Sequence, residues 1–599
     1  MILGVDVGGT FTDLVRWDGE RLHTAKVTTT PDQSDGVVDG SSLLGAETAE
    51  LLHGTTVATN ALLERKGVTT ALVTDAGFTD VIEIGRQDRP SLYDPFADRP
   101  EPLVPRGLRM TAPDRGDFTA TEALLERLTA AGAEAVAVSL LYSYRDPSHE
   151  RELGAALAAH GVQAISLSSD VAPEFREFER TSTTVLNAYL VPIVSAYLDR
   201  LTAAFKTAVM RSSGGLIAAD EAARLPASIL LSGPAGGVMA AAALGGALEH
   251  DSLIAFDMGG TSSDVCRIEE CRPAVAYERT VAGYPCRFPA VAVHTVGAGG
   301  GSIGWIDPGG ALRVGPNSAG ARPGPAAYGR GGNQPTVTDA NLMLGRLAPG
   351  GKLAGDVELD FDLAVTALAR LGEEIGVSAI QVALGMVTVV EAEMERAVRA
   401  VTVAEGADPR RAVLAAYGGA GGLHGSALAR RLEMQRMVVP PHAGVFSAVG
   451  LILSPPRGDA ARSVLLVPPD NDRLNRAVEE VARAVRRPGR AVRALVDARY
   501  VGQSHETTVE WSLGDGWDRL IESFHNEHRV RNGFSRIGDP VEVVTVRAEA
   551  VGAPAAEWDD LPDWRPEGDP GRGERPVITD AGETTASVWW RPALSVGAE

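Results

Sequence analysis

Cysteine is scarce in this sequence. Its 599 residues include three cysteines, Cys266, Cys271 and Cys286, too few for a disulfide framework in so long a chain. Such sparse use fits a reducing compartment. All three precede His294 at irregular spacings, so we interpret them as small buried apolar side chains, with a metal site as the open alternative.

Positive charge is also in deficit. The chain has 56 Lys and Arg against 78 Asp and Glu, a formal net charge of −22. The arginines between Ala482 and Arg499 alternate with Val and Ala, as on the solvated face of a helix. The resulting negative field repels nucleic acid and anionic membranes, so we expect neither as a partner. A polyphosphate ligand would have to be bound by backbone amides and a divalent cation.

Export signals and membrane spans are lacking as well. The sequence reaches Asp6 within a short apolar run, with no basic and then apolar signal segment before it. The one long uncharged stretch, Ala227 to Leu248, contains Gly233-Pro234 and Gly236-Gly237 near its start, which predicts a strand, a turn and a buried helix. We therefore expect a cytoplasmic protein.

The common nucleotide-binding motifs are absent, and a different glycine turn occurs twice. No Gly-x-x-x-x-Gly-Lys-Ser/Thr segment is present, nor a Gly-x-Gly-x-x-Gly turn with its downstream acidic residue. Instead, a short apolar strand ends in Asp-x-Gly-Gly-Thr at Asp6 and again at Asp257. Five of eight positions are identical at a constant offset of 251 residues, which predicts two related domains that each begin with a hairpin.

The residue types of the repeated turn suit phosphate and magnesium. Glycines leave backbone N–H groups open to phosphate oxygens, and nearby hydroxyls add donors. A strand-end aspartate suits Mg²⁺, which is often held by one or two carboxylates together with substrate phosphates. We therefore assign Asp6 and Asp257 to Mg²⁺, and predict that the phosphates are bound by Gly8, Gly9, Thr10 and Thr12 on one side and by Gly259, Gly260, Thr261 and Ser262 on the other. Asp13 and Asp264 either share this role or cap backbone N–H groups.

A third glycine cluster follows the apolar run 412–416. Gly418, Gly419 and Ala420 lie in this strand-then-turn segment, where the backbone could approach an adenosine closely. Glycine-rich turns of this kind also occur for packing alone. Its position after both hairpins favours nucleotide binding.

These motifs together resemble the actin, hexokinase and Hsp70 ATPase superfamily, and within it the hydantoinase A/5-oxoprolinase family. The resemblance covers nearly the whole chain and rests on residues 5–13, 53–61, 231–238, 256–261, 294–302, 313–316, 328–332, 336–341 and 500–506. It implies an α/β fold with duplicated ribonuclease-H-like ATPase lobes and a C-terminal α+β domain. Three departures are Gly422 in place of a usual Pro, Gly425 in place of a usual Ala, and Glu391-Ala392-Glu393-Met394 in place of an Asn-containing segment.

The resemblance also implies a reaction. ATP would phosphorylate the carbonyl oxygen of a small cyclic amide, such as a hydantoin, oxoproline or lactam, and thereby activate it for ring opening. Asp6 and Asp257 would be the catalytic residues, with ATP and Mg²⁺ as cofactors. The expected partners are a hydantoinase B-type subunit and a second copy of the chain within a hetero-oligomer. The alternatives are a ketone carboxylase subunit, a small-molecule kinase and a chaperone-like ATPase.

Substrate contacts and domain limits are the least determined by sequence. His53, Asn60 and Arg86 are the substrate-side candidates, although His53 could instead cap a turn and Arg86 could pair with a surface carboxylate. The glycine-rich segment 297–332 is interpreted as ordered loops near the cleft or a partner face. We expect an N-terminal lobe over residues 1–180, a second lobe over 181–455, and a C-terminal domain with a peripheral tail over 456–599.

Overall fold

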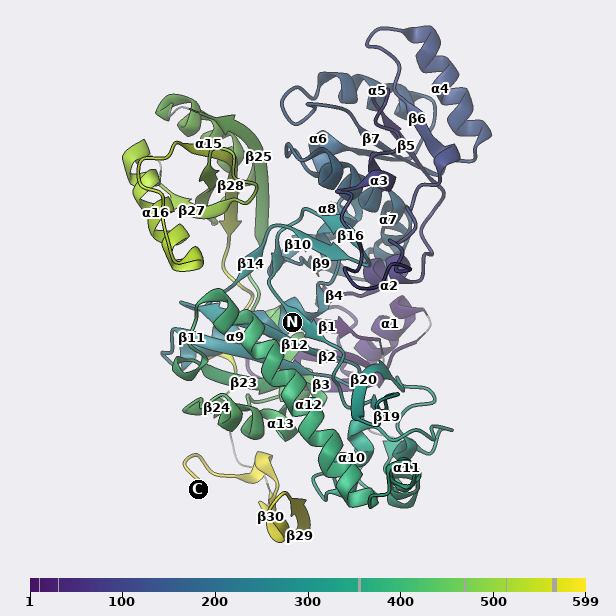
Figure 1. Cartoon of the computed structure of the whole chain (residues 1–599), viewed down its shortest axis with the longest axis vertical. Helices are drawn as coiled ribbons and strands as arrows, with labels where there is room; N and C mark the ends of the chain where they lie inside the picture. The colour runs from purple at the N-terminus through teal and green to yellow at the C-terminus, as the bar shows by residue number, and fades with distance from the viewer. Residues whose placement is uncertain are drawn as a thin grey trace.

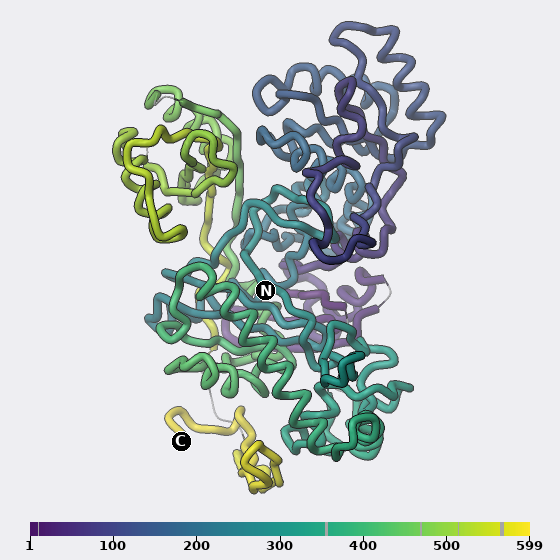
Figure 2. The backbone as a smooth tube through the Cα atoms, in the orientation of Figure 1, coloured from purple at the N-terminus to yellow at the C-terminus, as the bar shows by residue number. Residues whose placement is uncertain are grey.

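The computed structural model describes residues 1–9, 11–30, 32–353, 357–467, 470–512, 514–562 and 568–598. Two mixed sheets form its centre, as Figures 1 and 2 show. The first sheet has the order β10-β9-β4-β1-β2-β3. Its strands are β1 (Ile2–Val7), β2 (Phe11–Trp17), β3 (Leu22–Thr28), β4 (Glu50–Gly54), β9 (Lys206–Met210) and β10 (Leu216–Ala218).

The second sheet repeats the topology of the first. Its order is β13-β12-β11-β23-β24, with a further strand, β18, paired to β12. In both sheets the first three strands are antiparallel, and the next strands lie parallel to the first. These strands are β11 (Ser252–Met258), β12 (Ser263–Glu269), β13 (Arg272–Pro273), β18 (His294–Val296), β23 (Val413–Tyr417) and β24 (Arg436–Val438). The predicted duplication into ribonuclease-H-like lobes is confirmed.

The two lobes are joined by helices whose backbones touch. Helix α9 (Gly233–Ala247) and helix α14 (Phe446–Ile452) pack between the sheets. A Cβ on Gly450 would lie 1.8 Å from the carbonyl oxygen of Gly236, so only glycine permits this approach. The stretch 227–248 is thus mainly a buried interlobe helix, preceded by a 3-10 turn (Pro226–Ile229) and not by the predicted strand.

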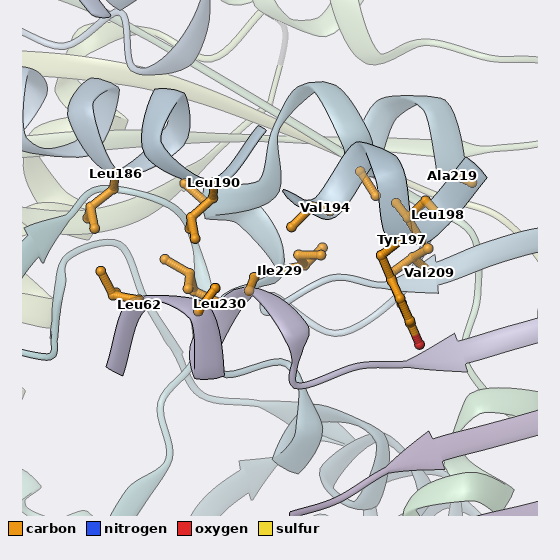
Figure 3. Packing of buried hydrophobic residues seen from close by; sticks show 14 of the residues in the cluster. Leu62, Leu186, Leu190, Val194, Tyr197, Leu198, Val209, Ala219, Ile229 and Leu230 are labelled. Atoms are coloured by element: carbon orange, nitrogen blue, oxygen red, sulfur yellow. The ribbon is translucent and has the colours of Figure 1, made fainter. Parts of the chain in front are cut away.

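The first lobe carries an inserted parallel sheet of order β6-β5-β7-β8. The long helix α7 (Glu177–Ala204) packs its apolar side chains between this insert and the first sheet. Figure 3 shows Leu186, Leu190, Val194 and Leu198 of α7 above Leu62 and Leu230. The inserted elements are α2 (Val57–Leu63), β5 (Thr70–Thr74), α3 (Val81–Ile84), β6 (Arg109–Thr111), α4 (Phe118–Ala130), β7 (Ala135–Ser139), α5 (Ser148–Ala159), β8 (Ala164–Leu167) and α6 (Ser168–Val171).

Strands β9 and β10 belong to the first sheet although they follow residue 180. The predicted limit at 180 therefore does not coincide with the edge of the first lobe, because the chain passes through α7 and returns to complete the sheet. Helices α1 (Gln33–Leu43) and α8 (Ala219–Arg224) complete this lobe.

The second lobe carries its own additions between β13 and β23. Besides β18, the described residues there form four short two-stranded sheets and the helices α10, α11 and α12. The bounds are β14 (Val275–Ala276), β15 (Arg279–Val281), β16 (Tyr284–Cys286), β17 (Ala290–Val291), β19 (Ser302–Ile306), β20 (Leu312–Ser318), β21 (Lys352–Leu353), β22 (Val357–Glu358), α10 (Val337–Met343), α11 (Phe361–Ile375) and α12 (Ala379–Val401), followed by α13 (Gly418–Arg431) after β23.

The C-terminal domain is the predicted α+β unit. An antiparallel sheet of order β25-β28-β26-β27 is combined with two helices, and in Figure 1 it lies apart from the first-lobe insert. Its elements are β25 (Arg457–Leu466), α15 (Asn471–Val485), β26 (Ala491–Tyr500), β27 (Thr507–Trp511), α16 (Trp517–Asn532) and β28 (Val541–Val551). The last hairpin, β29 (Gly571–Thr579) and β30 (Gly582–Trp589), returns to the second lobe, where the Ile578 N–H donates to the Leu344 carbonyl at 3.0 Å.

No single helix in the described ranges has both the length and the apolar composition of a membrane span. A pair of helical segments, Phe361–Ile375 and Ala379–Glu405, meets those criteria only jointly and is bent by 90°.

Candidate functional site

Four carboxylates lie at equivalent positions of the two sheets. Asp6 on β1 is paired with Asp13 on β2, and Asp257 on β11 with Asp264 on β12. Residues separated by the constant sequence offset therefore occupy equivalent positions in the two hairpins. Each hairpin presents one aspartate beside its turn and a second one directly across the ladder.

The two turns have the same backbone geometry. The N–H of Gly8 donates to the carbonyl of Phe11 at 3.0 Å, and the N–H of Gly259 donates to the carbonyl of Ser262 at 3.0 Å. At Gly9 and at Gly260, an added Cβ would meet no atom within 4 Å. Both turns therefore leave open space in front of the backbone, as an anion-binding turn requires.

The hairpins of the two lobes lie close enough for their charges to interact. Burial raises the pKa of Asp257 to about 8, with further increases from the negative charges of Asp264, Asp6 and Asp13. Burial likewise raises the pKa of Asp6 to about 7, with Asp13 adding to the effect. Asp6 therefore lies near enough to Asp257, across the two lobes, for its charge to raise the pKa of Asp257.

Such a pair fits a magnesium polyphosphate. Crowded carboxylates in a poorly solvated position repel one another, and a hard divalent cation removes that repulsion. Asp6 and Asp257 would hold Mg²⁺ or its water ligands, and the open turns at Gly9 and Gly260 would receive phosphate oxygens. The geometry supports this assignment, which remains a prediction.

Lys26 is a cation of this cleft that the sequence interpretation missed. Its Nζ lies 2.5 Å from Asp13 Oδ1 and donates at 3.0 Å to the carbonyl of Gly444, which lies in the segment leading to α14. Its charge lowers the pKa of both Asp6 and Asp257, against the larger effect of burial. A lysine opposite Asp13 on the next strand could have been found from the hairpin register, had β3 been predicted.

A glycine lies against each catalytic candidate. A Cβ on Gly54 would fall 2.5 Å from Asp6 Oδ1, and a Cβ on Gly418 would fall 2.2 Å from Asp257 Oδ1. Gly418 also has a φ of +83°, which favours glycine. The predicted adenosine segment therefore begins directly beside the second hairpin. Gly419 is exposed and Ala420 is half-buried at the start of α13.

The glycine-rich segment after β18 braces the second hairpin. The N–H groups of Gly300 and Gly301 donate to the carbonyls of Gly259 and Gly260 at 3.0 and 2.6 Å. A Cβ on Gly299 would lie 2.6 to 2.7 Å from the backbone of Thr261 and Ser262. The start of the segment 297–332 therefore lies against the second hairpin.

The hydroxyl candidates differ in their placement. Thr261 is exposed and Ser262 half-buried, both at the second turn. Thr12 is instead buried and its hydroxyl bonds to Thr29 Oγ1 at 3.2 Å, while Thr29 Oγ1 donates to the Gly8 carbonyl at 2.8 Å. Thr12 therefore supports the first turn from behind, and Thr10 lies outside the described residues.

His53 is enclosed in the first-lobe core. Its Nδ1 lies 3.2 Å from the Val5 carbonyl and its Nε2 lies 2.8 Å from the Tyr197 hydroxyl. Burial lowers its pKa to about 4. Figure 3 shows the Tyr197 side chain reaching from α7 toward the strands below. With both ring nitrogens occupied and no exposed surface, His53 has a packing role, and we do not retain it as a substrate contact.

The other two substrate candidates have local partners. Asn60 Nδ2 donates to Thr56 Oγ1 at 3.2 Å. The Arg86 guanidinium forms two bonds of 2.7 Å to Glu179, a nearly buried carboxylate on α7, and still exposes 52% of its side chain. Arg86 therefore forms an ion pair, but with a nearly buried carboxylate and not with the predicted surface one. Substrate roles for Asn60 and Arg86 remain predictions.

The cysteines do not gather around His294. Cys266 is buried in the core between the lobes, whereas Cys286 is buried in the first-lobe core and His294 is exposed. Across the part of the chain that the structure describes, no group of three or more His, Cys, Asp or Glu side chains is arranged to hold a metal ion.

Comparison with known proteins identifies the family. The model of the hydantoinase/oxoprolinase N-terminal region matches residues 2–161, and the hydantoinase/oxoprolinase model matches residues 180–460. Caprolactamase subunit alpha of Pseudomonas jessenii is 34% identical over 92% of this chain and 86% of its own length. The chain belongs to the hydantoinase/oxoprolinase family. Yeast 5-oxoprolinase (Saccharomyces cerevisiae) is 30% identical over 92% of this chain, which spans 49% of that longer protein.

Solved structures of the family share the whole fold. The crystal structure of the ATP-dependent caprolactamase from Pseudomonas jessenii matches 97% of this chain and 92% of its own, with a TM-score of 0.85 and 32% identity. A nucleotide-free acetone carboxylase structure matches 99% of this chain and 94% of its own, with a TM-score of 0.73 and 25% identity. The duplicated α/β architecture is therefore that of this family's ATP-dependent members.

Proposed function

We propose that this chain is the ATP-using subunit of a cyclic amide hydrolase. The observation that carries the proposal is the charge interaction between Asp6 and Asp257, each of which lies beside an open glycine turn and has a raised pKa. The family includes an ATP-dependent caprolactamase and 5-oxoprolinases, and those relatives support an amide as the substrate.

An unstrained amide needs activation because its carbon is a poor electrophile and its nitrogen a poor leaving group. In the proposed reaction the amide oxygen attacks the γ-phosphorus of ATP, an O–P bond forms, and the bond to ADP breaks. The O-phosphorylated amide is electron-poor at carbon, so water adds there. The ring C–N bond of this adduct then breaks as the nitrogen leaves with the electron pair and takes up a proton, which gives an acyl phosphate. A second water hydrolyses the acyl phosphate to the open-chain amino acid and phosphate.

The chain's own groups have distinct tasks in this scheme. Bound Mg²⁺ would supply positive charge to the phosphates as charge shifts toward ADP. The backbone N–H groups of the two turns would bind phosphate oxygens, and Lys26 would add a cation at the first hairpin. Asp257 would also orient the attacking oxygen.

Partners and location belong to the proposal too. Caprolactamase subunit alpha and the gamma subunit of the Aromatoleum aromaticum acetophenone carboxylase are named as subunits, which supports assembly with a hydantoinase B-type protein. Homo-dimerisation within that assembly, a cytoplasmic location, and the absence of nucleic-acid and membrane partners are inferred from sequence alone.

ATP turnover tests the proposal. ADP release is measured with hydantoin, 5-oxoproline, 2-pyrrolidone and caprolactam, with and without the neighbouring B-type protein. We expect at least one cyclic amide to stimulate ADP release and to yield its ring-opened acid. Asp6→Ala and Asp257→Ala should each abolish turnover in a folded protein.

Parallel reactions with acetone or acetophenone and bicarbonate separate the alternative. Product formation that depends on bicarbonate, with no response to any amide, would show a ketone carboxylase. A stable phosphorylated product would show a kinase. Either result would overturn the hydrolase assignment while the fold stands.

A further inference from the structure

The loop that connects α3 with β6 in the first-lobe insert leaves large apolar side chains open to solvent. Leu92, Tyr93 and Phe96 expose 77%, 95% and 89% of their surface, and the last two are the most exposed large apolar residues of the described chain. None of the three belongs to an apolar core of the described residues. Single exposed apolar residues are ordinary, whereas three within five positions mark an interaction surface. Residues 91–96 are called the apolar tip below.

Hydrogen bonds hold the base of this loop in place. Arg99 Nη1 donates to the Ile84 carbonyl at 2.5 Å, and Arg99 Nε donates to the Asp88 carbonyl at 3.2 Å. Just past Arg99, the Glu101 carbonyl accepts from the Tyr284 hydroxyl at 2.5 Å. Because Tyr284 lies on β16, the base of the loop is anchored to an element of the second lobe as well as to the insert.

Short turns also shape the apolar tip itself. The N–H of Asp94 donates to Ser91 Oγ at 3.1 Å, and the N–H of Phe96 donates to Asp94 Oδ1 at 2.9 Å. The backbone that carries Leu92, Tyr93 and Phe96 is therefore ordered before any partner binds. Such preorganisation lowers the entropy cost of association.

The charge of this loop differs from that of the whole chain. Residues 86–99 contain three arginines and three aspartates, so they carry no formal net charge, whereas the chain carries −22. The negative field of the chain repels an acidic protein, and the neutral loop adds nothing to that repulsion. Aromatic residues and arginine are also enriched at protein interfaces. The composition of the loop thus fits a protein partner, and the charges of Asp94 and Asp98 disfavour insertion into a membrane.

We propose that the apolar tip docks into an apolar pocket of the hydantoinase B-type partner subunit. This inference rests on the proposed function, which gives the chain that partner, and it names the surface of contact. Relatives named as subunits of caprolactamase and of acetophenone carboxylase support a partner of this kind. Yeast 5-oxoprolinase supports it too, because this chain spans 49% of that protein and the remainder belongs to the same polypeptide. Tyr93 and Phe96 would supply the buried aromatic contacts that dominate the affinity of many interfaces.

Binding to the separately purified B-type protein tests the proposal. The affinity is measured by calorimetry without ATP or amide, for the full-length wild type and for Tyr93→Ser and Phe96→Ser. We expect each change to weaken the complex about 10-fold or more, as is typical of an aromatic side chain at the centre of an interface. Because neither side chain packs in a core, both variants should melt with the wild type and bind Mg·ATP with wild-type affinity.

Phe118→Ser is the matched control. Phe118 is 85% exposed and lies in the same insert, at the start of α4 and outside the loop. Its replacement removes a similar aromatic surface and should leave the affinity for the B-type protein unchanged. A photoreactive benzoylphenylalanine in place of Phe96 should cross-link to the B-type protein, whereas the same group in place of Phe118 should not.

Several results would overturn the inference. They are no association of the wild-type proteins, wild-type affinity in both Tyr93→Ser and Phe96→Ser, or an equal loss in Phe118→Ser. Cross-linking from position 96 to a second copy of the chain, or binding of the wild type but not of Phe96→Ser to phosphatidylcholine vesicles, would assign the apolar tip to another occupant. Because association is measured without ATP or amide, a failure of every amide to stimulate ADP release would remove the proposed reaction and leave this result in place.

Discussion

Replacing Asp257 with asparagine should inactivate the protein and also stabilise it. Folding raises the pKa of Asp257 from its ordinary value of 3.8 to about 8. Ionisation of Asp257 therefore opposes folding at any pH above about 3.8. Four pKa units correspond to at most about 6 kcal/mol at 1.36 kcal/mol per unit. Partial exposure of the carboxylate and relaxation of its surroundings reduce this cost. We therefore expect Asp257→Asn to raise the free energy of unfolding by about 1–3 kcal/mol at pH 8.5.

The sign of the pH dependence makes this prediction specific. A carboxylate with a raised folded pKa costs nothing below about pH 4, and its cost grows as the pH rises toward 8. Thermal unfolding should therefore show Asp257→Asn above the wild type by about 2–5 °C at pH 8.5, with the difference shrinking toward pH 5. Asp199→Asn, at an exposed carboxylate on α7, controls for a general charge effect. An Asp257→Asn protein that melts at or below the wild-type temperature at pH 8.5 would refute the proposed repulsion.

Three further changes probe the surroundings of the cleft. Lys26→Met should weaken ATP binding about tenfold or more in calorimetry, since it removes a cation beside the phosphates, whereas Lys206→Met, at a lysine exposed on β9, should not. His53→Gln should make the free energy of unfolding, measured in urea, less sensitive to acid. Because the pKa of His53 is about 4 in the folded protein and 6.5 ordinarily, the free energy of unfolding of the wild type should fall by up to about 3 kcal/mol between pH 6.5 and pH 4. An equal fall in the variant would contradict this. Gly54→Ala should push the Asp6 carboxylate aside and reduce the rate of ADP release at least tenfold, and an unchanged rate would contradict the role given to Asp6.

The duplicated lobes could be predicted because the motif and its chemistry are local. Asp6, Gly8 and Gly9 lie on one hairpin, and an equal hairpin recurs at a fixed offset, so register and function follow from short-range sequence. The glycine-rich loops were also interpretable, since Gly299 permits a backbone contact that no other residue allows.

The errors and omissions arose from long-range packing. His53 lies near the end of a strand, where the sequence pattern is the same for a buried residue and for a cleft residue. The residue that encloses it, Tyr197, comes from α7, more than 140 residues later. The first sheet also continues past residue 180, because β9 and β10 return to it after α7. Lys26 was missed because β3 was not predicted, although its partner Asp13 lies on the neighbouring strand.

Binding of Mg·ATP to Gly9→Val and Gly260→Val tests the central claim most directly. Neither side chain would meet protein atoms at its Cβ, so both variants should melt with the wild type, as should Gly107→Val, a control glycine with equally open space in the first-lobe insert. The account predicts that either change alone abolishes calorimetric binding of Mg·ATP while Gly107→Val binds normally. Wild-type affinity in Gly9→Val or in Gly260→Val would contradict a nucleotide held between the two hairpins.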